Sequence, residues 1–563
     1  MPLHKSIILL KMTQDNDEEQ SGVEQSLLND AETGQNIRVT QNKRESAAGE
    51  LMDIIIKKVK SSETLTKLDQ KSQGQNPEFI IPKKIKRRAL IMQVFMACLA
   101  TFTALSSGMA LGFPAITLQA LTNQTISGPL TLNSDQGSWF ASINTIACPF
   151  GGLFSAYILD KLGRKRTLIL INFISIISWG IMAFASKTDF TLMYTQLLVA
   201  RFLIGINIGL TSAPPSIYSA EISYPHIRGR LTLGTSFMIA LGILWIYLFG
   251  YFFPEDWRLV SGISAAVCVV SLIALIPMPE TPVYLASKGK DKKAEKSLKI
   301  FRGARKHETQ RPDIMSELEQ LQIQAASDKV KRDNGSSMEM LTHPEVYKPL
   351  LHMIALFAVQ QFSGIFVIIV YAANFAEASH VAIDSFLAAV LIGVARVIAT
   401  ICIFFVMDKF GRKPPLLFSG IMMTICMYGL SAYNYFEISG VGWLPGLLLI
   451  LFIFTSTIGF LSVPFAMIAE VFPRKARGLG AGLSITAAYF LFFVALKLYP
   501  TMVEYLDNVK IFGIYGTVSL IGVFFVHFIL IETKGKTLEQ IEAHFKNKNN
   551  VESVENDRVF QIS

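Results

Sequence analysis

The chain has 563 residues, of which 51% are apolar and 17% are charged, and its mean hydropathy is +0.41. These values exclude an ordinary soluble enzyme, because soluble domains carry about 25% charged residues. The formal net charge of +9 is explained by basic loops beside a membrane, so it gives no reason to expect a nucleic-acid partner.

Residues 1–88 are polar, mixed in charge and weakly periodic, which predicts a disordered cytoplasmic N-terminal tail. The apolar run Ser6–Leu10 is too short for a secretory signal, so the first span is expected to direct insertion. The basic run Pro82–Arg88 precedes that span and would anchor it at anionic headgroups.

Twelve predominantly apolar runs follow, each close to the ~20 residues that cross roughly 30 Å of hydrocarbon. Six precede a long polar stretch and six follow it. This predicts an all-α membrane protein with twelve transmembrane helices in two six-helix pseudo-symmetric bundles. The expected segments are an N-terminal bundle over 89–278, a cytoplasmic central loop with short helices over 279–348, a C-terminal bundle over 349–531 and a cytoplasmic C-terminal tail over 532–563.

Two charged motifs occur once in each half at a nearly constant offset. The first motif is DKLGRK, which begins at Asp160 and returns as DKFGRK at Asp408. The second motif is a glutamate with an Arg-Gly pair further along the chain: Glu221 with Arg228-Gly229, and Glu470 with Arg477-Gly478. Because opposite charges can pair in one conformation and separate in another, they could bias the two-state equilibrium of alternating access, with each glutamate pairing with its following arginine. The alternative is that these residues only fix topology. The candidate gating residues are Asp160, Arg164, Glu221, Arg228, Asp408, Arg412, Glu470 and Arg477.

Lysine and arginine are concentrated in alternate loops, whereas residues 113–137 have neither. Positive loops stay in the cytoplasm, so both termini are expected there. Asn123 then lies in an outer loop, where its sequon is a usable glycosylation site. Asn334 lies in the central loop, which is expected inside the cell, so its sequon should not be used. All five cysteines lie in apolar runs, so no disulfide, metal site or cofactor is expected.

Charged residues are scarce inside the spans. Arg201 and Arg396 lie near the middle of the fourth and eighth runs, so each should face protein or water. Arg201 either contacts helix carbonyls or belongs to the transport pathway. Lys497 is expected to snorkel outward without a functional role. No Asp or Glu lies deep in any run, which argues against proton coupling.

The seventh run carries the best candidate binding residues. Gln360 and Tyr371 share one helix face, and Gln361 and Ser363 adjoin it. A neutral polyol would satisfy these groups, because sugar hydroxyls and amides both donate and accept hydrogen bonds. The alternative is hydrogen bonding between helices.

The chain resembles the sugar porter family of the major facilitator superfamily and, within it, insect-type facilitated trehalose transporters. The resemblance covers roughly residues 90–545. It implies the major facilitator fold, location in the plasma membrane, function as a monomer, and facilitated transport of trehalose or a hexose, with Gln360 and Gln361 bound to the sugar. It rests on both DKxGRK loops and on the segments Arg201–Gly205, Tyr218–Glu221, Pro279–Leu285, Gln360–Gly364 and Glu532–Gly535.

Several positions depart from the family pattern. Phe366 and Arg396 stand where asparagine is common, Phe465 replaces a tryptophan, and Ala488-Tyr489 replaces an Asn-Trp pair. Two alternatives to a sugar uniporter therefore remain: a carrier of the same fold that uses Arg396 to bind a non-sugar or anionic molecule, and a non-transporting sugar sensor. No catalytic motif predicts an enzyme. The candidate substrate-binding residues are Gln360, Gln361, Ser363, Phe366, Tyr371, Arg396, Phe465 and Tyr489.

Overall fold

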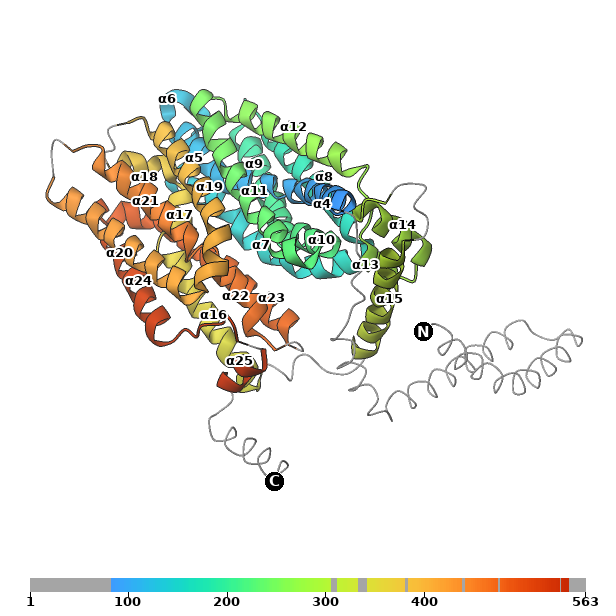
Figure 1. The fold of residues 1–563 in the computed structure, drawn as a ribbon. Coiled ribbons are helices and arrows are strands. Elements are labelled where there is room, and N and C mark those ends of the chain that lie inside the picture. The colour runs from blue at the N-terminus through green and yellow to red at the C-terminus, as the bar shows by residue number, and fades with distance from the viewer. Residues whose placement is uncertain are drawn as a thin grey trace, which may run out of the picture. The chain divides into compact units, whose positions relative to one another are not determined.

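All regular elements in the described part of the chain are helices (Figure 1). Most of the expected N-terminal tail and the end of the C-terminal tail lie outside the described residues, as does Asn334. The computed structural model describes residues 83–304, 311–332, 342–379, 383–437, 441–473, 476–536 and 538–545.

The first half begins with a helix at Lys83, inside the segment expected to be a tail. Residues 113–122, which lie in the long stretch without lysine or arginine, continue the helix α5 to Thr122. The elements of this half are α4 (Lys83–Phe102), α5 (Leu105–Thr122), α6 (Gln124–Ser127), a 3-10 turn (Gly128–Leu130), α7 (Ser134–Leu162), α8 (Arg164–Ala183), α9 (Phe190–Thr211), α10 (Pro214–Ile222), α11 (Pro225–Phe252) and α12 (Trp257–Leu275).

Three helices lie between the halves, and the second half repeats the pattern of the first. The central helices are α13 (Pro282–Ser287), α14 (Asp291–Phe301) and α15 (Pro312–Arg332). The second half contains α16 (Pro344–Phe362), α17 (Ile365–Val370), α18 (Ala372–Ala378), α19 (Ser385–Phe410), α20 (Lys413–Tyr435), α21 (Leu444–Ile458), α22 (Val463–Val471), α23 (Arg477–Tyr505) and α24 (Asn508–Phe528), and it is followed by α25 (Leu538–Phe545).

The described residues contain 11 stretches that are long and apolar enough to span a membrane. The expected seventh run is not among them, because it is broken into α16, α17 and α18. The first break lies at Gly364, which has φ +87°, and the second at Tyr371. With this broken element in the seventh position, the order of spans matches the twelve that the sequence predicts.

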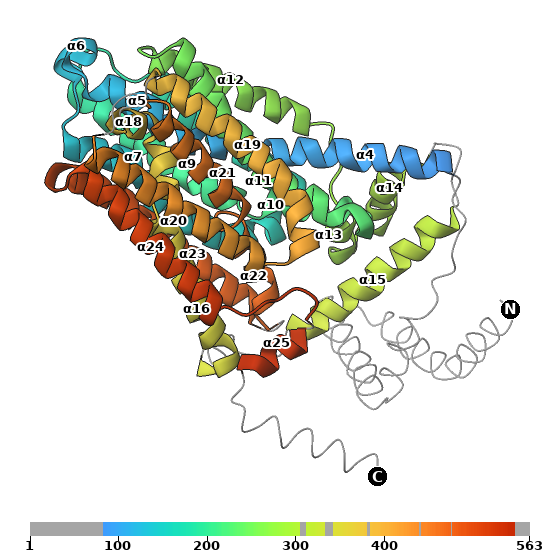
Figure 2. The ribbon, with the colours of Figure 1, turned by 60° about the vertical axis from the view of Figure 1, so that its left-hand side comes forward.

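Helices pack mainly within each half, as α7 does on α9 and α20 on α24. The α7–α9 contact is close because Gly205 and Gly209 present no side chain: a Cβ atom at either position would lie within about 2.1 Å of a carbonyl oxygen of α7. The halves meet where α7 packs on α23 and α11 on α19 (Figures 1 and 2). Segments of both halves thus face each other along these two helix pairs.

Candidate functional site

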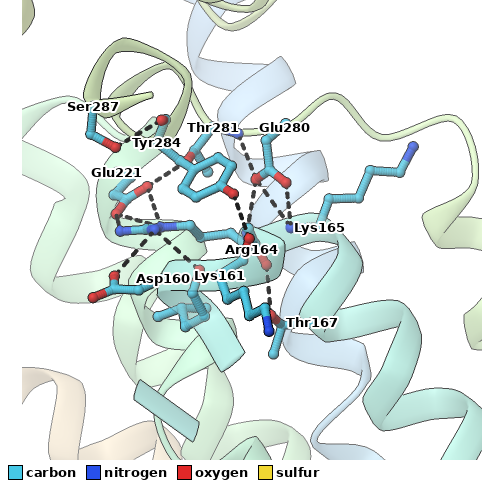
Figure 3. A network of polar contacts seen from close by, with 12 residues as sticks. Asp160, Lys161, Arg164, Lys165, Thr167, Glu221, Glu280, Thr281, Tyr284 and Ser287 are labelled. Atoms are coloured by element: carbon cyan, nitrogen blue, oxygen red, sulfur yellow. Dashed lines mark hydrogen bonds and ion pairs between the residues drawn. The ribbon is translucent and has the colours of Figure 1, made fainter. Parts of the chain in front are cut away.

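Arg164, at the start of α8, binds Glu221 of α10 through two guanidinium nitrogens (Figure 3). Nη2 lies 2.7 Å from Oε1 and Nε lies 2.9 Å from it. The Thr281 hydroxyl donates to the other carboxylate oxygen at 2.5 Å. Both charged side chains are 13% exposed, so this two-point pair is partly shielded from water.

Glu280 caps the start of α8. Its Oε1 accepts the backbone N–H groups of Arg164 at 3.0 Å and Lys165 at 3.1 Å, as Figure 3 shows. A carboxylate is favourable there because the first turn leaves N–H groups unpaired and carries a partial positive charge. The preceding Gly163 has φ +97°, and a Cβ atom there would lie 2.5 Å from Glu280 Oε2. Glycine is therefore required at this turn. We call Arg164, Glu221, Glu280 and Thr281 the first-half network.

The second half repeats this arrangement with Arg412, Glu470, Glu532 and Thr533, which we call the second-half network. Arg412 Nη2 lies 2.5 Å from Glu470 Oε1, and the Thr533 hydroxyl donates to Oε2 at 2.6 Å. Glu532 accepts the N–H groups of Arg412 at 3.1 Å and Lys413 at 2.8 Å. Two copies of one motif therefore fold into two copies of one network.

Hydrogen bonding sets the charge state of Glu532. Burial by itself would raise the pKa of this carboxyl, but backbone N–H donors from Lys534, Lys413, Arg412 and Thr533 favour the ionised form. Their combined effect prevails, and the pKa lies below its ordinary value. The cap is therefore an anion at neutral pH.

Glu221 and Glu470 each bind the arginine of the DKxGRK loop in their own half. Glu221 binds Arg164, whereas Arg228 is exposed on α11, so the expected pairing of Glu221 with Arg228 is not formed. Glu470 binds Arg412, and the expected pairing of Glu470 with Arg477 stays a prediction. Asp160 lies one turn from Arg164, with 3.9 Å between charged atoms. The side chains of Asp408 and Arg477 lie outside those that the structure describes.

Four network residues were not among the predicted site residues: Glu280, Thr281, Glu532 and Thr533. A signal for them exists in the sequence. A Glu-Thr doublet follows the sixth span and returns after the last span, so its repetition parallels that of the DKxGRK loops.

Polar contacts join the two halves away from the two networks. The Tyr247 hydroxyl of α11 donates to the Ile369 carbonyl oxygen of α17, and further contacts lie at the end of the bundle opposite to the networks. Lys497 Nζ of α23 lies 2.6 Å from Asp135 Oδ1 and 2.6 Å from Ser138 Oγ, both of α7, and 4.6 Å from the ring centroid of Trp139. Lys497 does not simply snorkel, because it joins the two halves. Gln119 of α5 also donates to Glu377 at 3.4 Å. Each network, by contrast, stays within its own half.

The polar residues of the broken seventh element are buried. Gln360 donates to the carbonyl oxygens of Phe460 at 2.6 Å and Leu461 at 3.2 Å. These carbonyls lie in the break between α21 and α22, where the helical ladder leaves them free. Gln360 thus makes the contact between helices that was the alternative to sugar binding. Ser363 donates to the Gln360 carbonyl oxygen, and Gln361 donates to the Gln360 side chain.

Several buried polar atoms have no hydrogen-bond partner among the described residues. In the seventh element they are Gln361 Oε1, Tyr371 OH and Asn374 Oδ1, and on α11 the atom is Trp245 Nε1. An unpaired polar atom costs about 1–3 kcal/mol when it is buried, which makes such atoms candidates for ligand contacts. Sequence reasoning missed Trp245 and Asn374.

The remaining predicted binding residues are aromatic. Phe366 is buried and packs against Phe492, with ring centroids 4.6 Å apart. Phe465 is 41% exposed and packs edge-on against Phe357. Tyr489 is half-buried on α23. These rings lie on α17, α22 and α23 of the second half.

The two arginines within spans differ in their surroundings. Arg201 is fully buried and donates to the carbonyl oxygens of Phe140 at 3.0 Å, Ala110 at 2.7 Å and Ala141 at 3.2 Å. This is the helix-carbonyl contact that was one of its two expected roles. Arg396 is 5% exposed, and its Nε and Nη1 have no partner in the described part of the chain.

Residues 93–545 match the family model for sugar (and other) transporters. The chain is 30% identical to the facilitated trehalose transporter Tret1-2 homolog of Drosophila simulans, over 84% of this chain and 94% of the relative. It is 27% identical to the facilitated trehalose transporter Tret1 of Apis mellifera ligustica, over 82% and 90% of the two chains.

Solved structures share the fold. The inward-open xylose transporter XylE of E. coli superposes with a TM-score of 0.66 at 23% identity, covering 79% of this chain and 98% of that one. XylE bound to 6-bromo-6-deoxy-D-glucose gives a TM-score of 0.64 at 23% identity, over 81% and 99%. These likenesses confirm the predicted twelve-helix major facilitator fold. The chain is a multi-pass membrane protein that belongs to the sugar (and other) transporter family.

Proposed function

We propose that this chain is a facilitative transporter, a uniporter, of a neutral sugar, either trehalose or a hexose. Its relatives named as facilitated trehalose transporters support the substrate class. Among the described residues no Asp or Glu side chain is fully buried. A proton-coupled carrier needs a carboxylate that binds and releases its proton within the membrane, so this observation supports a uniporter.

The observation that carries the binding proposal is the set of unpaired polar atoms in the broken seventh element. Gln361 Oε1 and Tyr371 OH are buried without a hydrogen-bond partner in the part of the chain that the structure describes, and sugar hydroxyls can bond to both. Gln360 and Ser363 hold the helix break in shape. The rings of Phe366, Phe465 and Tyr489 would contact the apolar faces of the sugar, as aromatic side chains do in ligand sites.

We propose that the networks act in gating, with their end of the bundle and both chain termini on the cytoplasmic side of the plasma membrane. Each network joins the start of α8 or α20 to a neighbouring helix and to the segment after the last helix of its half. It therefore moves as part of its half. The halves are joined at the opposite end through Lys497 and Asp135. Alternating access requires such contacts to break at one end while others form at the other end.

The test is uptake of labelled trehalose and glucose into proteoliposomes, with and without a pH gradient. We expect saturable flux that the gradient does not change. Gln361→Met should reduce the flux about tenfold, equal to the loss of one hydrogen bond worth roughly 1.4 kcal/mol. Gln322→Met, the same change on the exposed face of α15, serves as the control. Accumulation driven by the gradient would instead indicate a symporter.

A second candidate is a carrier of small organic anions. Two guanidinium nitrogens of Arg396 that have no hydrogen-bond partner among the described residues favour it, because a carboxylate could complete such a buried cation. Under this alternative the same vesicles take up an organic anion and not the sugars, and Arg396→Asn abolishes that uptake. Ligand binding without flux of either solute would instead identify a sensor.

A further inference from the structure

A cavity of about 370 Å³ lies where the first membrane helix begins, at the network end of the bundle. Lys86, Arg87 and Leu90 line it from α4, and Tyr224 and His226 line it from the start of α11. Two cationic side chains and an imidazole therefore converge with an aromatic ring and an aliphatic side chain. None of these residues belongs to the networks or to the proposed sugar site.

The charge balance of the cavity favours an anion. The nearby carboxylates are already paired, since Glu317 accepts from Arg302 at 2.7 Å and Asp313 accepts from Arg311 at 2.6 Å. The side chains of Lys86 and Arg87, by contrast, are exposed. The first turn of α11 also has no side-chain cap, and its partial positive charge adds to the attraction.

The position of the cavity indicates a lipid. The apolar span that contains α4 begins at Ile85, so Lys86 and Arg87 stand at the depth of lipid headgroups. Further along α4, Ile91 is 60% exposed and Phe95 is 55% exposed, as expected of side chains that contact acyl chains. A molecule held here can thus place phosphate among the cations and its apolar tail along α4.

We propose that this cavity binds the headgroup of an anionic phospholipid that carries phosphate monoesters, such as a phosphoinositide. The inference rests on the proposed cytoplasmic orientation, because the cytoplasmic leaflet contains such lipids. Clusters of lysine and arginine beside a membrane helix are the usual means of recognising them.

Residues beside the cavity join the membrane helix α4 to the central helix α14. Gln93 of α4 accepts the Tyr224 N–H at 2.9 Å and donates to the Phe301 carbonyl oxygen at 3.1 Å. The Arg302 guanidinium stacks 4.4 Å from the Tyr224 ring centroid. Figure 2 shows α4 beside α14. A bound lipid would therefore stabilise the packing of α14 on the first half.

The experiment measures binding to the purified full-length chain in detergent, without transport. Short-chain phosphatidylinositol 4,5-bisphosphate should raise the thermal unfolding midpoint, and phosphatidylcholine should not. Lys86→Gln with Arg87→Gln should weaken this binding at least about tenfold, because each basic residue near the surface contributes to the attraction. Lys292→Gln with Lys293→Gln, an equal change of charge on exposed residues of α14, should leave it unchanged.

Equal binding by the two double variants would overturn the proposal. So would tight binding of soluble inositol trisphosphate by a protein that does not respond to the lipid, because the ligand would then be a soluble phosphate. The single variants Lys86→Gln and Arg87→Gln should each show a smaller loss of affinity, which provides a check if the double variant fails to fold. Since no flux is measured, the result does not depend on whether the sugar assignment is correct.

Discussion

Arg201 and Arg396 are both buried within spans, yet within the described part of the chain Arg201 bonds to three carbonyl oxygens and two nitrogens of Arg396 have no hydrogen-bond partner. A paired buried charge contributes to structure, and an unpaired one costs stability unless a ligand completes it. The same residue type can therefore be structural at one site and available for a ligand at another.

Substitution by methionine should separate these roles. Arg201→Met removes three hydrogen bonds and should lower the unfolding midpoint, because the free energy of unfolding should fall by an amount on the order of 2 kcal/mol. Arg396→Met removes an unpaired charge, so the midpoint should stay the same or rise. Thermal unfolding in detergent measures both. An equal loss in the two variants would show that Arg396 has a structural partner.

Gly163 is constrained by both conformation and space. Gly163→Ala should destabilise the fold by about 2 kcal/mol, because alanine disfavours φ +97° and its Cβ would collide with the Glu280 carboxylate. Gly478→Ala is the matched control, since that glycine lies in a helix with no atom within 4 Å of the added carbon. The two unfolding midpoints give the comparison, and equal midpoints would mean that the turn at residue 163 adapts without cost.

At the scale of elements, a carboxylate from a distant segment completes the first turn of α20. Glu532 lies 120 residues after Arg412, which stands at the start of the helix that Glu532 caps, so it couples the end of the second half to the loop before α20. The first half uses Glu280 in the same way for α8. The first turns of α8 and α20 are thus each capped by a carboxylate from a segment far away in the sequence.

This cap should make stability depend on pH. The pKa of Glu532 is lower in the folded chain than its ordinary value of 4.5. The contribution of the ionised Glu532 to the free energy of unfolding is therefore complete above pH 4.5, and it is lost as the pH falls through the lower pKa of the folded chain. Glu532→Gln should lower the unfolding midpoint at neutral pH, and its difference from wild type should shrink as the pH falls below about 4.5. A difference that stays constant with pH would show that the charge of Glu532 has no part in capping.

At the scale of the whole molecule, the pair between Lys497 and Asp135 holds the two halves together at one end. These side chains are 28% and 74% exposed, so the pair is worth at most about 1 kcal/mol. That is enough to change a two-state population by up to roughly fivefold. Such a weak contact suits a transporter whose halves must separate at this end in every transport cycle.

Asp135→Asn should therefore increase the population that is open at this end. Spin labels at Thr122 and Tyr505, on helix ends of different halves, should report a larger share of long distances once Cys98 and Cys402 are replaced. The charge swap Asp135→Lys with Lys497→Asp should restore the original distribution. Lys510→Gln is the control, because its pair with Asp507 lies within one segment. An unchanged distribution in Asp135→Asn would rule out this contact as a latch.

Much of the fold could be predicted without coordinates, because span length and hydropathy are local properties of the chain. The duplicated DKxGRK loops were sufficient to predict two similar bundles, and both loops lie at equivalent turns. Partner choice was harder. Glu221 could be placed near several cations, but the packing of α10 on α8 brings it to Arg164 and not to Arg228.

The amino-acid sequence alone determined the number and order of the spans, the positions of the charged motifs and the family, since each depends on composition and spacing. Three-dimensional packing decided the remainder. It assigned Gln360 to the carbonyls of a broken helix, left Nε and Nη1 of Arg396 without a hydrogen-bond partner among the described residues, and placed Lys497 against the other half. These outcomes depend on which side chains from distant segments meet in space, and hydrogen bonds within about 3 Å cannot be inferred from periodicity along one helix.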